Sequence, residues 1–319
     1  MSERRPESVL WDFLRGATMT RALATVSELG ISQALAGGPR RVEELAAEAG
    51  VDPDSLHRLL RALASDGVFA EGEPGVFRNT AASDVLGREG WPEFAHLFGG
   101  VFYEAVRPLG LAIRTGEATF AEDFGTEFWS WLAEHPVERG HFDRAMAGGK
   151  DGMAERLAAL DWRGGELVVD VGGGNGRLLV GLLRRLPGLR GIVFDLPETE
   201  RDEAALGDRI EFVAGSFFER VPSGDAYLLS GILHDWDDER AGAILAVIRA
   251  SAPRGARVLV LETVVPPGND PNGAKWLDLL MLVLARGRER TEPEWRRLLA
   301  VTGLEPVRIE DGLIEARCP

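Results

Sequence analysis

Cysteine is almost absent from the 319-residue chain, which contains only Cys318, beside the C-terminal proline. A single cysteine excludes a disulfide within the chain and any metal site built on several cysteines. This usage fits a reducing compartment, and we expect the protein in the cytoplasm. We expect no membrane span, because the most apolar stretch, 276–285, is short and is interrupted by Asp278. The charged N-terminal residues lack the apolar core of a signal peptide.

Positive charge is also scarce. Lysine and arginine total 36 residues against 51 aspartate and glutamate residues, which gives a formal net charge of −15. Such a surface repels phosphate groups, so we expect neither nucleic acid nor anionic membranes as partners. The five histidines have no repeated metal-ligand spacing, and we expect no bound metal. With 45% hydrophobic and 27% charged residues the composition is that of an ordered globular protein, and the length suggests two domains.

The first half of the chain has the apolar spacing of helices. Residues 42–49 form one amphipathic segment, and the Asp-Pro pair at 52–53 supplies a cap and a first residue for the next helix. That helix is predicted from leucines that recur every three to four residues over 56–63. Two short apolar runs then flank the Glu-Pro-Gly turn at 73–75, which predicts a hairpin. Two helices, a tight turn and a hairpin make a winged helix-turn-helix, within a helical domain over residues 1–155.

The sequence changes character at Glu166. Short apolar runs rich in valine, isoleucine and leucine alternate from here with helix-like segments. The runs cover 167–171, 192–195, 210–213, 226–229 and 258–261. Near-continuous apolar strands that alternate with helices predict a parallel sheet with both faces covered. We therefore expect a second, α/β domain over residues 156–319.

Glycines cluster where the first of these strands meets a helix. Gly172, Gly174 and Gly176 occupy alternate positions there, and Asp170 stands just before them. The alternative is a purely structural turn, but such glycines also let a backbone turn sharply and approach a ligand closely. A dinucleotide fold has the spacing G-x-G-x-x-G, and Asp170 would repel its pyrophosphate, so a cationic ligand such as S-adenosylmethionine fits better. Asp195, which ends the next strand, suits the ribose hydroxyls of either ligand.

His234 follows a predicted strand at the sheet edge where open α/β sheets bind ligands. Histidine titrates near neutral pH and is the most frequent general base, so His234 is the catalytic candidate. The alternative is a connecting residue before a helix that Asp237 or Asp238 caps. Glu262, at the end of a neighbouring strand, and Glu289 are the carboxylates that would serve this base. For Glu289, the local pattern Arg-Glu-Arg-Thr by itself favours a solvated run of charges.

Four segments of the second half together carry a resemblance to a known family. They are DVGGGNG at 170–176, FDLP at 194–197, LHDWDDE at 233–239 and ERT at 289–291 with Glu294 and Trp295. In these segments the chain resembles the caffeate- and acetylserotonin-type small-molecule O-methyltransferases, including bacterial natural-product members. The resemblance covers 166–319, and the N-terminal winged-helix layout is also similar. It implies a Rossmann-like class I methyltransferase domain preceded by an all-α winged-helix dimerisation domain, and therefore a homodimer.

The same resemblance implies S-adenosylmethionine as methyl donor. It also implies that the acceptor group is a hydroxyl, expected to be phenolic, of a small aromatic or polyketide-like molecule. The resemblance further implies His234 as the base, flanked by Glu262 and Glu289. Of these two carboxylates, we expect Glu262 as the partner of the base. The residues implied to contact the donor are Asp170, Gly172, Gly174, Asp195, Ser216, Phe217 and Ser230. Two of them depart from the family's pattern, since it often has an acidic residue at 216 and, in plant members, a lysine at 230. Candidates to line the acceptor site, each of which also fits a core or cap position, are Phe142, Met146, Asp235, Trp276 and Met281.

Two other interpretations stay open at this point. A winged helix-turn-helix reads DNA in many proteins, and its second helix would offer Arg58 and Arg61. Acidic residues around that helix and the net charge of −15 argue against such a regulator. The other is a relative on the same scaffold that binds the donor but performs hydroxylation or decarboxylation. Some relatives that lost the histidine no longer methylate, whereas this chain keeps His234.

Overall fold

The structure, a computed structural model, describes residues 5–197, 199 and 206–319. The chain forms two compact units, one of residues up to Arg107 with Leu132–Gly148 and one of Pro108–Trp131 with Gly149–Pro319. It passes between them three times, whereas the sequence predicts one boundary between residues 155 and 156. Across the described residues, no helix is long and apolar enough to cross a bilayer.

The first unit contains the predicted winged helix-turn-helix. Helices α4 (Val42–Ala49) and α5 (Pro53–Ser65) precede a hairpin of β2 (Phe69–Glu71) and β3 (Val76–Asn79), and β1 (Arg40–Arg41) also pairs with β3. Asp52 caps α5 by accepting a hydrogen bond from the Ser55 N–H at 2.8 Å. The other helices of the first unit are α1 (Pro6–Leu14), α2 (Gly16–Glu28), α3 (Ile31–Ala34), α6 (Ala81–Leu86), α7 (Trp91–Gly99), α8 (Val101–Ala105) and α12 (Pro136–Ala147). Helix α11 (Phe128–Glu134) has residues in both units.

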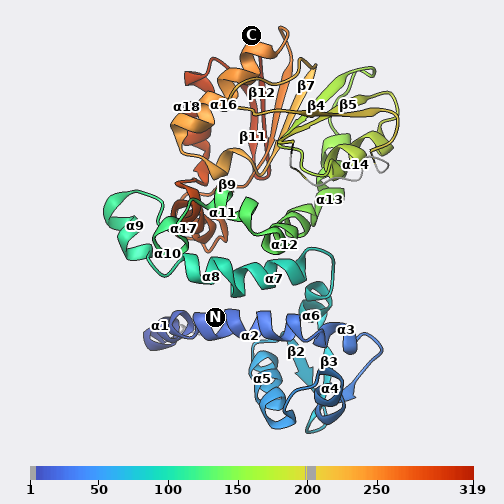
Figure 1. Cartoon of the computed structure of the whole chain (residues 1–319), viewed down its shortest axis with the longest axis vertical. Helices are drawn as coiled ribbons and strands as arrows, with labels where there is room; N and C mark the ends of the chain where they lie inside the picture. Colours follow the sequence, from blue (N-terminus) through green and yellow to red (C-terminus); the bar gives the residue numbers. More distant parts are fainter. Residues whose placement is uncertain (1–4, 198, 200–205) are drawn as a thin grey trace. The chain divides into compact units, whose positions relative to one another are not determined.

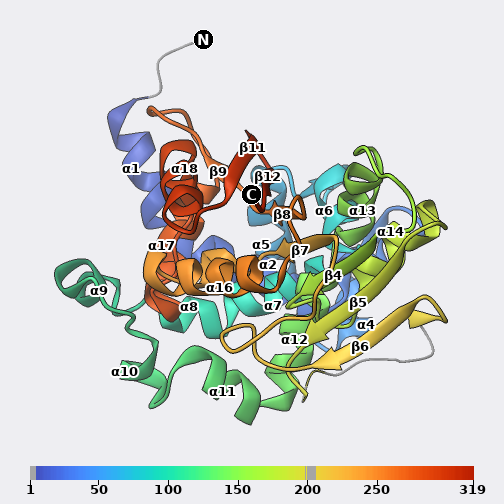
Figure 2. The same ribbon diagram turned by 90° about the horizontal axis from the view of Figure 1, so that it is seen from above.

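A seven-stranded sheet forms the centre of the second unit. Its strands lie in the order β11-β12-β8-β7-β4-β5-β6, which can be followed across Figure 2. Their bounds are β4 (Leu167–Val171), β5 (Arg190–Asp195), β6 (Ile210–Ala214), β7 (Ala226–Ser230), β8 (Arg257–Leu261), β11 (Glu305–Glu310) and β12 (Leu313–Arg317). The five strands from β8 to β6 are parallel, as predicted, and β11 and β12 add an antiparallel hairpin at one edge.

Helices cover both faces of this sheet (Figure 1). Helices α13 (Lys150–Ala158) and α14 (Arg177–Arg185) pack on one face, and α16 (Asp238–Ser251) and α18 (Glu292–Val301) on the other. Successive residues of β4 point to opposite cores, with Val168 in one and Val169 in the other. The remaining elements are α9 (Leu109–Thr115), α10 (Phe120–Phe124), η1 (Leu233–Asp235), α17 (Ala274–Ala285), and the paired short strands β9 (Val264–Val265) and β10 (Arg290–Thr291).

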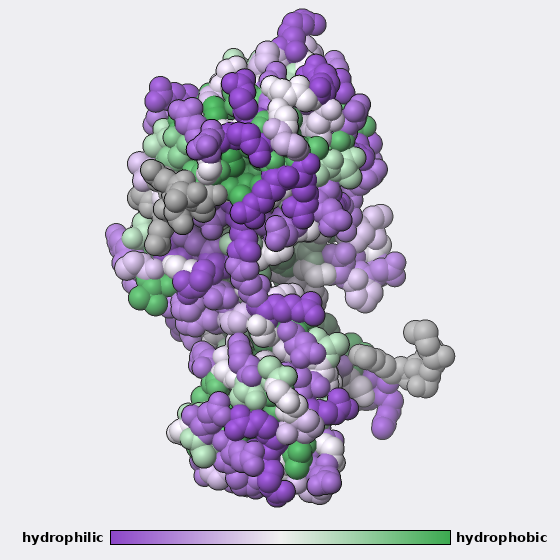
Figure 3. Space-filling view, turned by 90° about the vertical axis from the view of Figure 1, so that its right-hand side faces the viewer, coloured by the Kyte–Doolittle hydropathy of each residue, from purple (hydrophilic) through white to green (hydrophobic). Residues whose placement is uncertain are grey.

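The surface seen in Figure 3 is mostly hydrophilic, as the charged composition leads one to expect. Apolar side chains instead fill the cores on the two faces of the seven-stranded sheet, where nearly every residue of β4, β7 and β8 is buried. Each fully buried leucine or valine contributes about 1.5–3 kcal/mol. The sheet therefore provides a rigid frame for the polar residues at the ends of its strands.

Candidate active site

Polar residues gather at the carboxyl ends of the parallel strands. Asp170 lies in β4, Asp195 ends β5, Ser230 ends β7, and Glu262 follows β8. Because these strands are parallel neighbours, their ends meet at one edge of the sheet. This is the edge at which the sequence predicts the ligands.

The loop after β4 has an unusual backbone. Gly172, Gly174 and Gly176 all have positive φ angles, of 68°, 58° and 77°. This conformation favours glycine and explains why glycines occupy alternate positions. A Cβ atom on Gly172 would lie 2.5 Å from Cδ1 of Ile232, so the loop also lies close to the segment before η1.

Asp170 is a buried acid beneath this loop, with 1% of its surface exposed. Its Oδ2 atom has no hydrogen-bond partner among the described residues. The pKa of Asp170 is raised to about 7, mainly by burial. The Lys150 ammonium lowers this pKa, and the Asp195 carboxylate raises it further. An unpartnered buried carboxylate oxygen is costly, and a donor from a bound ligand would relieve that cost. The residues present thus fit the cationic donor that the sequence predicts.

Asp195 fixes the loop from the neighbouring strand. Its Oδ2 accepts a hydrogen bond from the Gly174 N–H at 2.7 Å, and its Oδ1 accepts from the Leu196 N–H and the Thr199 hydroxyl. A carboxylate has about four acceptor positions, and these contacts use three. Its predicted contact with a ribose remains a prediction.

The other predicted donor contacts lie around this edge. Phe217 lies beside Gly172, 3.7 Å from the position that a Cβ atom there would take. The Ser216 hydroxyl accepts a hydrogen bond from the Phe218 N–H at 3.3 Å. Ser230 accepts a hydrogen bond from Nζ of Lys150 at 2.9 Å. Lys150 is not among the site residues predicted from the sequence.

His234 sits in the short helix η1 and contacts a buried carboxylate. Its Nδ1 lies 2.7 Å from Oε1 of Glu289, whose side chain is 1% exposed. Glu289 is therefore not part of a solvated charge run, and that interpretation of the local sequence is wrong. The preference for Glu262 as the direct partner is also wrong, because Oε1 of Glu262 accepts hydrogen bonds from the Ile232 and Leu233 N–H groups. Glu262 stabilises the turn that carries the histidine.

The charges around the imidazole set its protonation. Burial disfavours the charged ring, but the carboxylates of Asp235, Glu289 and Glu262 outweigh it and raise the pKa of His234 to about 10. Burial also raises the pKa of Asp235, to about 7, against the attraction of His234. Since Glu289 is an acceptor, Nδ1 donates to it and the neutral ring presents a lone pair at Nε2.

Residues that the sequence analysis did not select hold η1 in place. A Cβ atom on Gly287 would collide with the carbonyl oxygen of His234, and that oxygen accepts a hydrogen bond from the Arg288 N–H at 2.7 Å. Arg290 is fully buried and donates to the carbonyl oxygens of Leu233 and Trp236, each at 2.9 Å. Gly287 lies outside the segments that carry the resemblance, and Arg290 lies in the ERT segment without an expected role, because both act through contacts distant in sequence.

Glycine also leaves space beside the imidazole. Gly231 has a φ angle of 67°, and a Cβ atom on it would lie 3.5 Å from Nε2 of His234. Oδ1 of Asp235 lies 3.6 Å from the same nitrogen. The nitrogen that would take a proton thus faces a carboxylate and a position without a side chain.

The acceptor-site candidates are dispersed. Asp235 adjoins the base, and Met281 and Trp276 lie on α17, the first buried and the second 61% exposed. Phe142 and Met146 lie on α12, in the first unit. Oδ1 of Asp235 lies 3.6 Å from Nε2 of the catalytic candidate. An acceptor-site role remains a prediction for all five residues.

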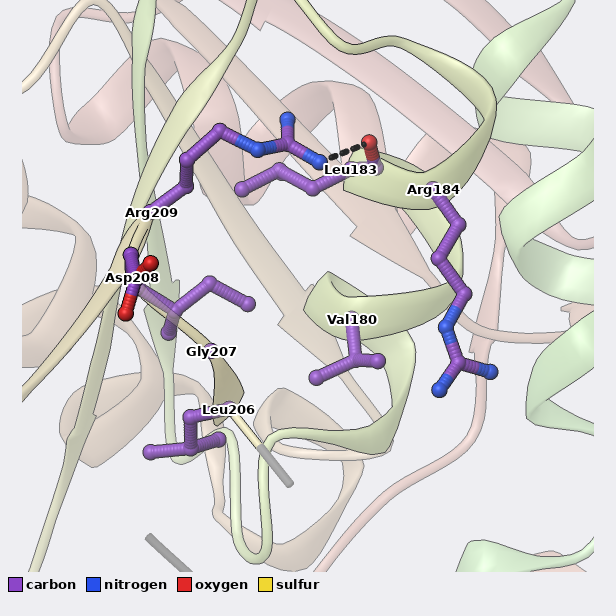
Figure 4. A pocket seen from close by; sticks show the side chains of 8 residues that line it. Val180, Leu183, Arg184, Leu206, Gly207, Asp208 and Arg209 are labelled. Carbon is purple, nitrogen blue, oxygen red and sulfur yellow. Dashed lines mark hydrogen bonds between the residues drawn. The ribbon is translucent and has the colours of Figure 1, made fainter. Parts of the chain in front are cut away.

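A pocket of about 540 Å³ lies elsewhere in the second unit, between α14 and the start of β6 (Figure 4). It is lined by Val180, Leu183 and Arg184 together with residues 206–210. The Arg209 guanidinium there donates to the Leu183 carbonyl at 2.7 Å, so its charge is already engaged. None of the predicted site residues lines this pocket. Within the described residues, no group of three or more His, Cys, Asp or Glu side chains is arranged to hold a metal ion.

Comparison with known proteins identifies the chain. A model of the O-methyltransferase domain matches residues 106–305, and a model of the O-methyltransferase dimerisation domain matches residues 11–89. It belongs to the family of S-adenosylmethionine-dependent O-methyltransferases. The methyltransferase fold and the N-terminal dimerisation domain expected from the sequence are thereby confirmed.

Relatives of this O-methyltransferase cover nearly its whole length. The phenazine O-methyltransferase PhzM of Lysobacter antibioticus is 39% identical over 95% of this chain and 92% of its own. The mitomycin biosynthesis 6-O-methyltransferase of Streptomyces lavendulae is 36% identical over 96% of this chain and 90% of its own. The structure of human N-acetylserotonin methyltransferase in complex with SAM is 26% identical over 99% of this chain and 98% of that one, with a TM-score of 0.87. The chain is an O-methyltransferase of the kind used in natural-product biosynthesis.

Proposed function

We propose that this enzyme methylates a hydroxyl, most simply a phenolic one, of a small aromatic or polyketide-like natural product, with His234 as its general base. The observation that carries the proposal is the buried pair of His234 and Glu289, with 2.7 Å between Nδ1 and Oε1. Because Glu289 engages Nδ1, Nε2 is left to take a proton from the acceptor hydroxyl. The absence of a side chain at Gly231 gives that hydroxyl room.

The electrostatics support this role. A phenol has a pKa of about 10 and an ordinary histidine one of about 6.5, so proton transfer between them in water costs about 5 kcal/mol. The surrounding carboxylates raise the pKa of His234 to about 10, which makes the transfer nearly balanced. Most imidazoles then carry a proton at neutral pH, so we expect turnover to increase with pH. General-base action contributes about 10²–10⁴ in rate, and alignment of the reacting atoms up to about 7–11 kcal/mol.

The site offers suitable partners for S-adenosylmethionine, which when bound supplies a methyl group made electrophilic by its sulfonium. We assign Asp170 to its ammonium group because Oδ2 lacks another partner. Asp195 retains one acceptor position for a ribose hydroxyl, and Ser216 offers a hydroxyl to the adenine. The open backbone of Gly172 and Gly174 allows close approach of the ligand.

An aromatic acceptor is supported by the relative named for phenazine methylation. Asp235 adjoins Nε2 of His234 and is the best supported of the acceptor-site candidates. The retained His234–Glu289 pair favours methyl transfer over hydroxylation or decarboxylation on this scaffold, since a proton acceptor serves attack by a hydroxyl.

A homodimer is the proposed assembly. Helix α1 exposes Leu10, Trp11 and Leu14, with 65%, 64% and 73% of their surfaces accessible, and the dimerisation model begins at residue 11. Such apolar exposure on one helix is typical of an interface. Light scattering should give twice the chain mass of 34.7 kDa. The double variant Leu10→Glu, Leu14→Glu should shift the measured mass toward that of the monomer. The single buried cysteine fits the cytoplasm as the compartment.

The deciding experiment combines the protein with methyl-labelled S-adenosylmethionine and a panel of phenols. We expect label in an O-methyl product, with no transfer to matched methyl ethers that lack the hydroxyl. Mass spectrometry of the products distinguishes an added methyl group from an added oxygen or a lost carboxyl group. Products of either of the latter kinds, without methylation, would overturn the proposal.

A further inference from the structure

Lys150 is a partly buried cation that the proposed reaction does not yet use. It is the first residue of α13, and its Nζ donates a hydrogen bond to Oγ of Ser230, 2.9 Å away at the end of β7. An ammonium group has three donors, and this contact occupies one of them. Ser230 in turn donates to the sulfur of Met153, one turn further along α13. The Lys150 ammonium is thus fixed at the edge where β4 and β7 end.

The position of this lysine runs against local preference. A cation in the first turn of a helix is disfavoured, because the helix dipole places partial positive charge there. Burial adds a second cost and lowers the pKa of Lys150. Lysine is otherwise rare, since the sequence has only one other, Lys275. Residues that violate local rules in this way are typical of functional sites.

Asp170 supplies the opposite charge at the same edge. The two side chains attract each other, yet Oδ2 of Asp170 has no hydrogen-bond partner among the described residues. One buried acid in β4 and one partly buried base of α13, held at the end of β7, therefore both keep hydrogen-bonding capacity. Such a pair matches a zwitterion that carries an ammonium and a carboxylate on the same carbon atom.

We propose that Lys150, oriented by Ser230, binds the α-carboxylate of S-adenosylmethionine while Asp170 binds its α-ammonium. This inference rests on the proposed function for the identity of the donor. It makes Lys150 a binding residue and Ser230 a positioning residue that acts through it. The positive end of α13 adds to the attraction for a carboxylate at the same place.

Two ligands that differ by one group test this assignment. Decarboxylated S-adenosylmethionine lacks the carboxylate but keeps the ammonium, the sulfonium and the adenosine. Calorimetry without acceptor should show that Lys150→Met weakens the binding of S-adenosylmethionine by roughly 10- to 100-fold. This is the range expected for the loss of a hydrogen bond to a charged group. The same variant should bind the decarboxylated ligand within threefold of the wild type. Asp170→Asn should weaken both ligands, because both keep the ammonium.

Two further variants separate binding from folding. Lys275→Met removes the only other lysine, whose ammonium contacts the Gly268 and Asp270 carbonyls, and should leave both affinities unchanged. The exchange Lys150→Ser with Ser230→Lys keeps a lysine and a hydroxyl in contact and should recover most of the lost affinity. Equal losses for both ligands in Lys150→Met, or unchanged affinity for S-adenosylmethionine, would overturn the inference. If the wild type bound neither ligand, the proposed donor would fail instead.

Discussion

The donor loop and the base cluster lie at the same edge of one sheet, but the chain builds them differently. The donor loop comes from adjacent segments, β4, its glycines and β5, and its shape is set by positive φ angles. The base cluster joins η1, the end of β8 and residues 287–290, and Glu289 lies 55 positions from His234. The first region thus depends on backbone conformation and the second on the balance of buried charges.

The two regions also differ in whether their central polar group already has a partner. In the donor loop, Asp170 has an oxygen without a partner, which a ligand can engage. In the base cluster, Glu289 contacts the imidazole and Oε1 of Glu262 accepts two backbone hydrogen bonds, while Oε2 of Glu262 has no partner among the described residues. The imidazole therefore already has its carboxylate partner, whereas Oδ2 of Asp170 has none and can take a donor from a ligand. The following substitutions test that contrast.

The largest effect should come from removing the base. His234→Ala should reduce methyl transfer by about 10²–10⁴, since it removes general-base catalysis, and leave the affinity for S-adenosylmethionine within twofold. Single-turnover rates and calorimetry measure the two quantities separately. His57→Gln, which changes an imidazole that contacts Glu71 in the winged helix, is the matched control. Wild-type turnover in His234→Ala would remove His234 from the mechanism.

Asp170→Asn should stabilise the protein while it weakens donor binding. The folded pKa of Asp170 is about 7 against an ordinary 3.8, so the folded state binds a proton more tightly, and this acid reduces stability as pH increases from about 4 to 7. Asparagine does not titrate. We therefore expect a gain of roughly 2–4 kcal/mol in unfolding free energy at pH 8 and little gain below pH 4.

Denaturant unfolding across this pH range measures the gain. Asp225→Asn is a poor control, because the Asp225 side chain accepts a hydrogen bond from the Leu167 N–H. Asp54→Asn, on the exposed first turn of α5, serves better. A difference between Asp170→Asn and wild type that stays constant with pH would show that Asp170 does not carry a raised pKa.

The same contrast explains what could be predicted from the sequence. The parallel strands and the glycine loop were predictable, because apolar runs and alternating glycines are local patterns. The hairpin of β11 and β12 was not predicted, since β11 is a largely exposed edge strand with charged residues and no apolar run. Its exposure hides the period-two signal of a half-buried strand.

The base cluster shows the limit more sharply. Glu289 lies between two arginines, a pattern typical of a surface, yet it is buried because η1 packs against it. Lys150 was not selected from the sequence, since its partner Ser230 is 80 positions away. Residue types predicted His234 as a base, but only the folded chain determines which of two glutamates contacts it.

A substitution in the donor loop tests its dependence on backbone conformation. Gly172→Ala should weaken the binding of S-adenosylmethionine by roughly 10- to 30-fold. A positive φ angle costs about 1–2 kcal/mol for residues other than glycine, and Ile232 must also move to make room for the new Cβ atom. Gly255→Ala is the matched control, with a φ angle of 80° and open space around its Cβ position. It should share the cost of the positive φ angle but keep its affinity for S-adenosylmethionine, as calorimetry can show. Equal affinities in both variants would mean that the loop does not hold the donor.

The smallest and most specific effect concerns the charge of Glu289. Glu289→Gln keeps the shape of the side chain but removes one of the carboxylates that raise the pKa of His234 to about 10. A general base acts in its unprotonated form, so activity increases as pH passes through that pKa. We expect the midpoint of the pH–rate profile to move down by about one unit, with a loss of a few-fold in the maximal rate.

The acceptor's own ionisation contributes equally to both profiles if one phenol is used, so the difference between the proteins reports the imidazole alone. Glu292→Gln, which removes the same charge from an exposed ion pair with Arg296, should leave the midpoint in place. A midpoint unchanged in Glu289→Gln would assign the raised pKa to Asp235 and Glu262 instead. An upward shift would contradict the electrostatic account altogether, because removing a negative charge next to a cation can only weaken its hold on the proton.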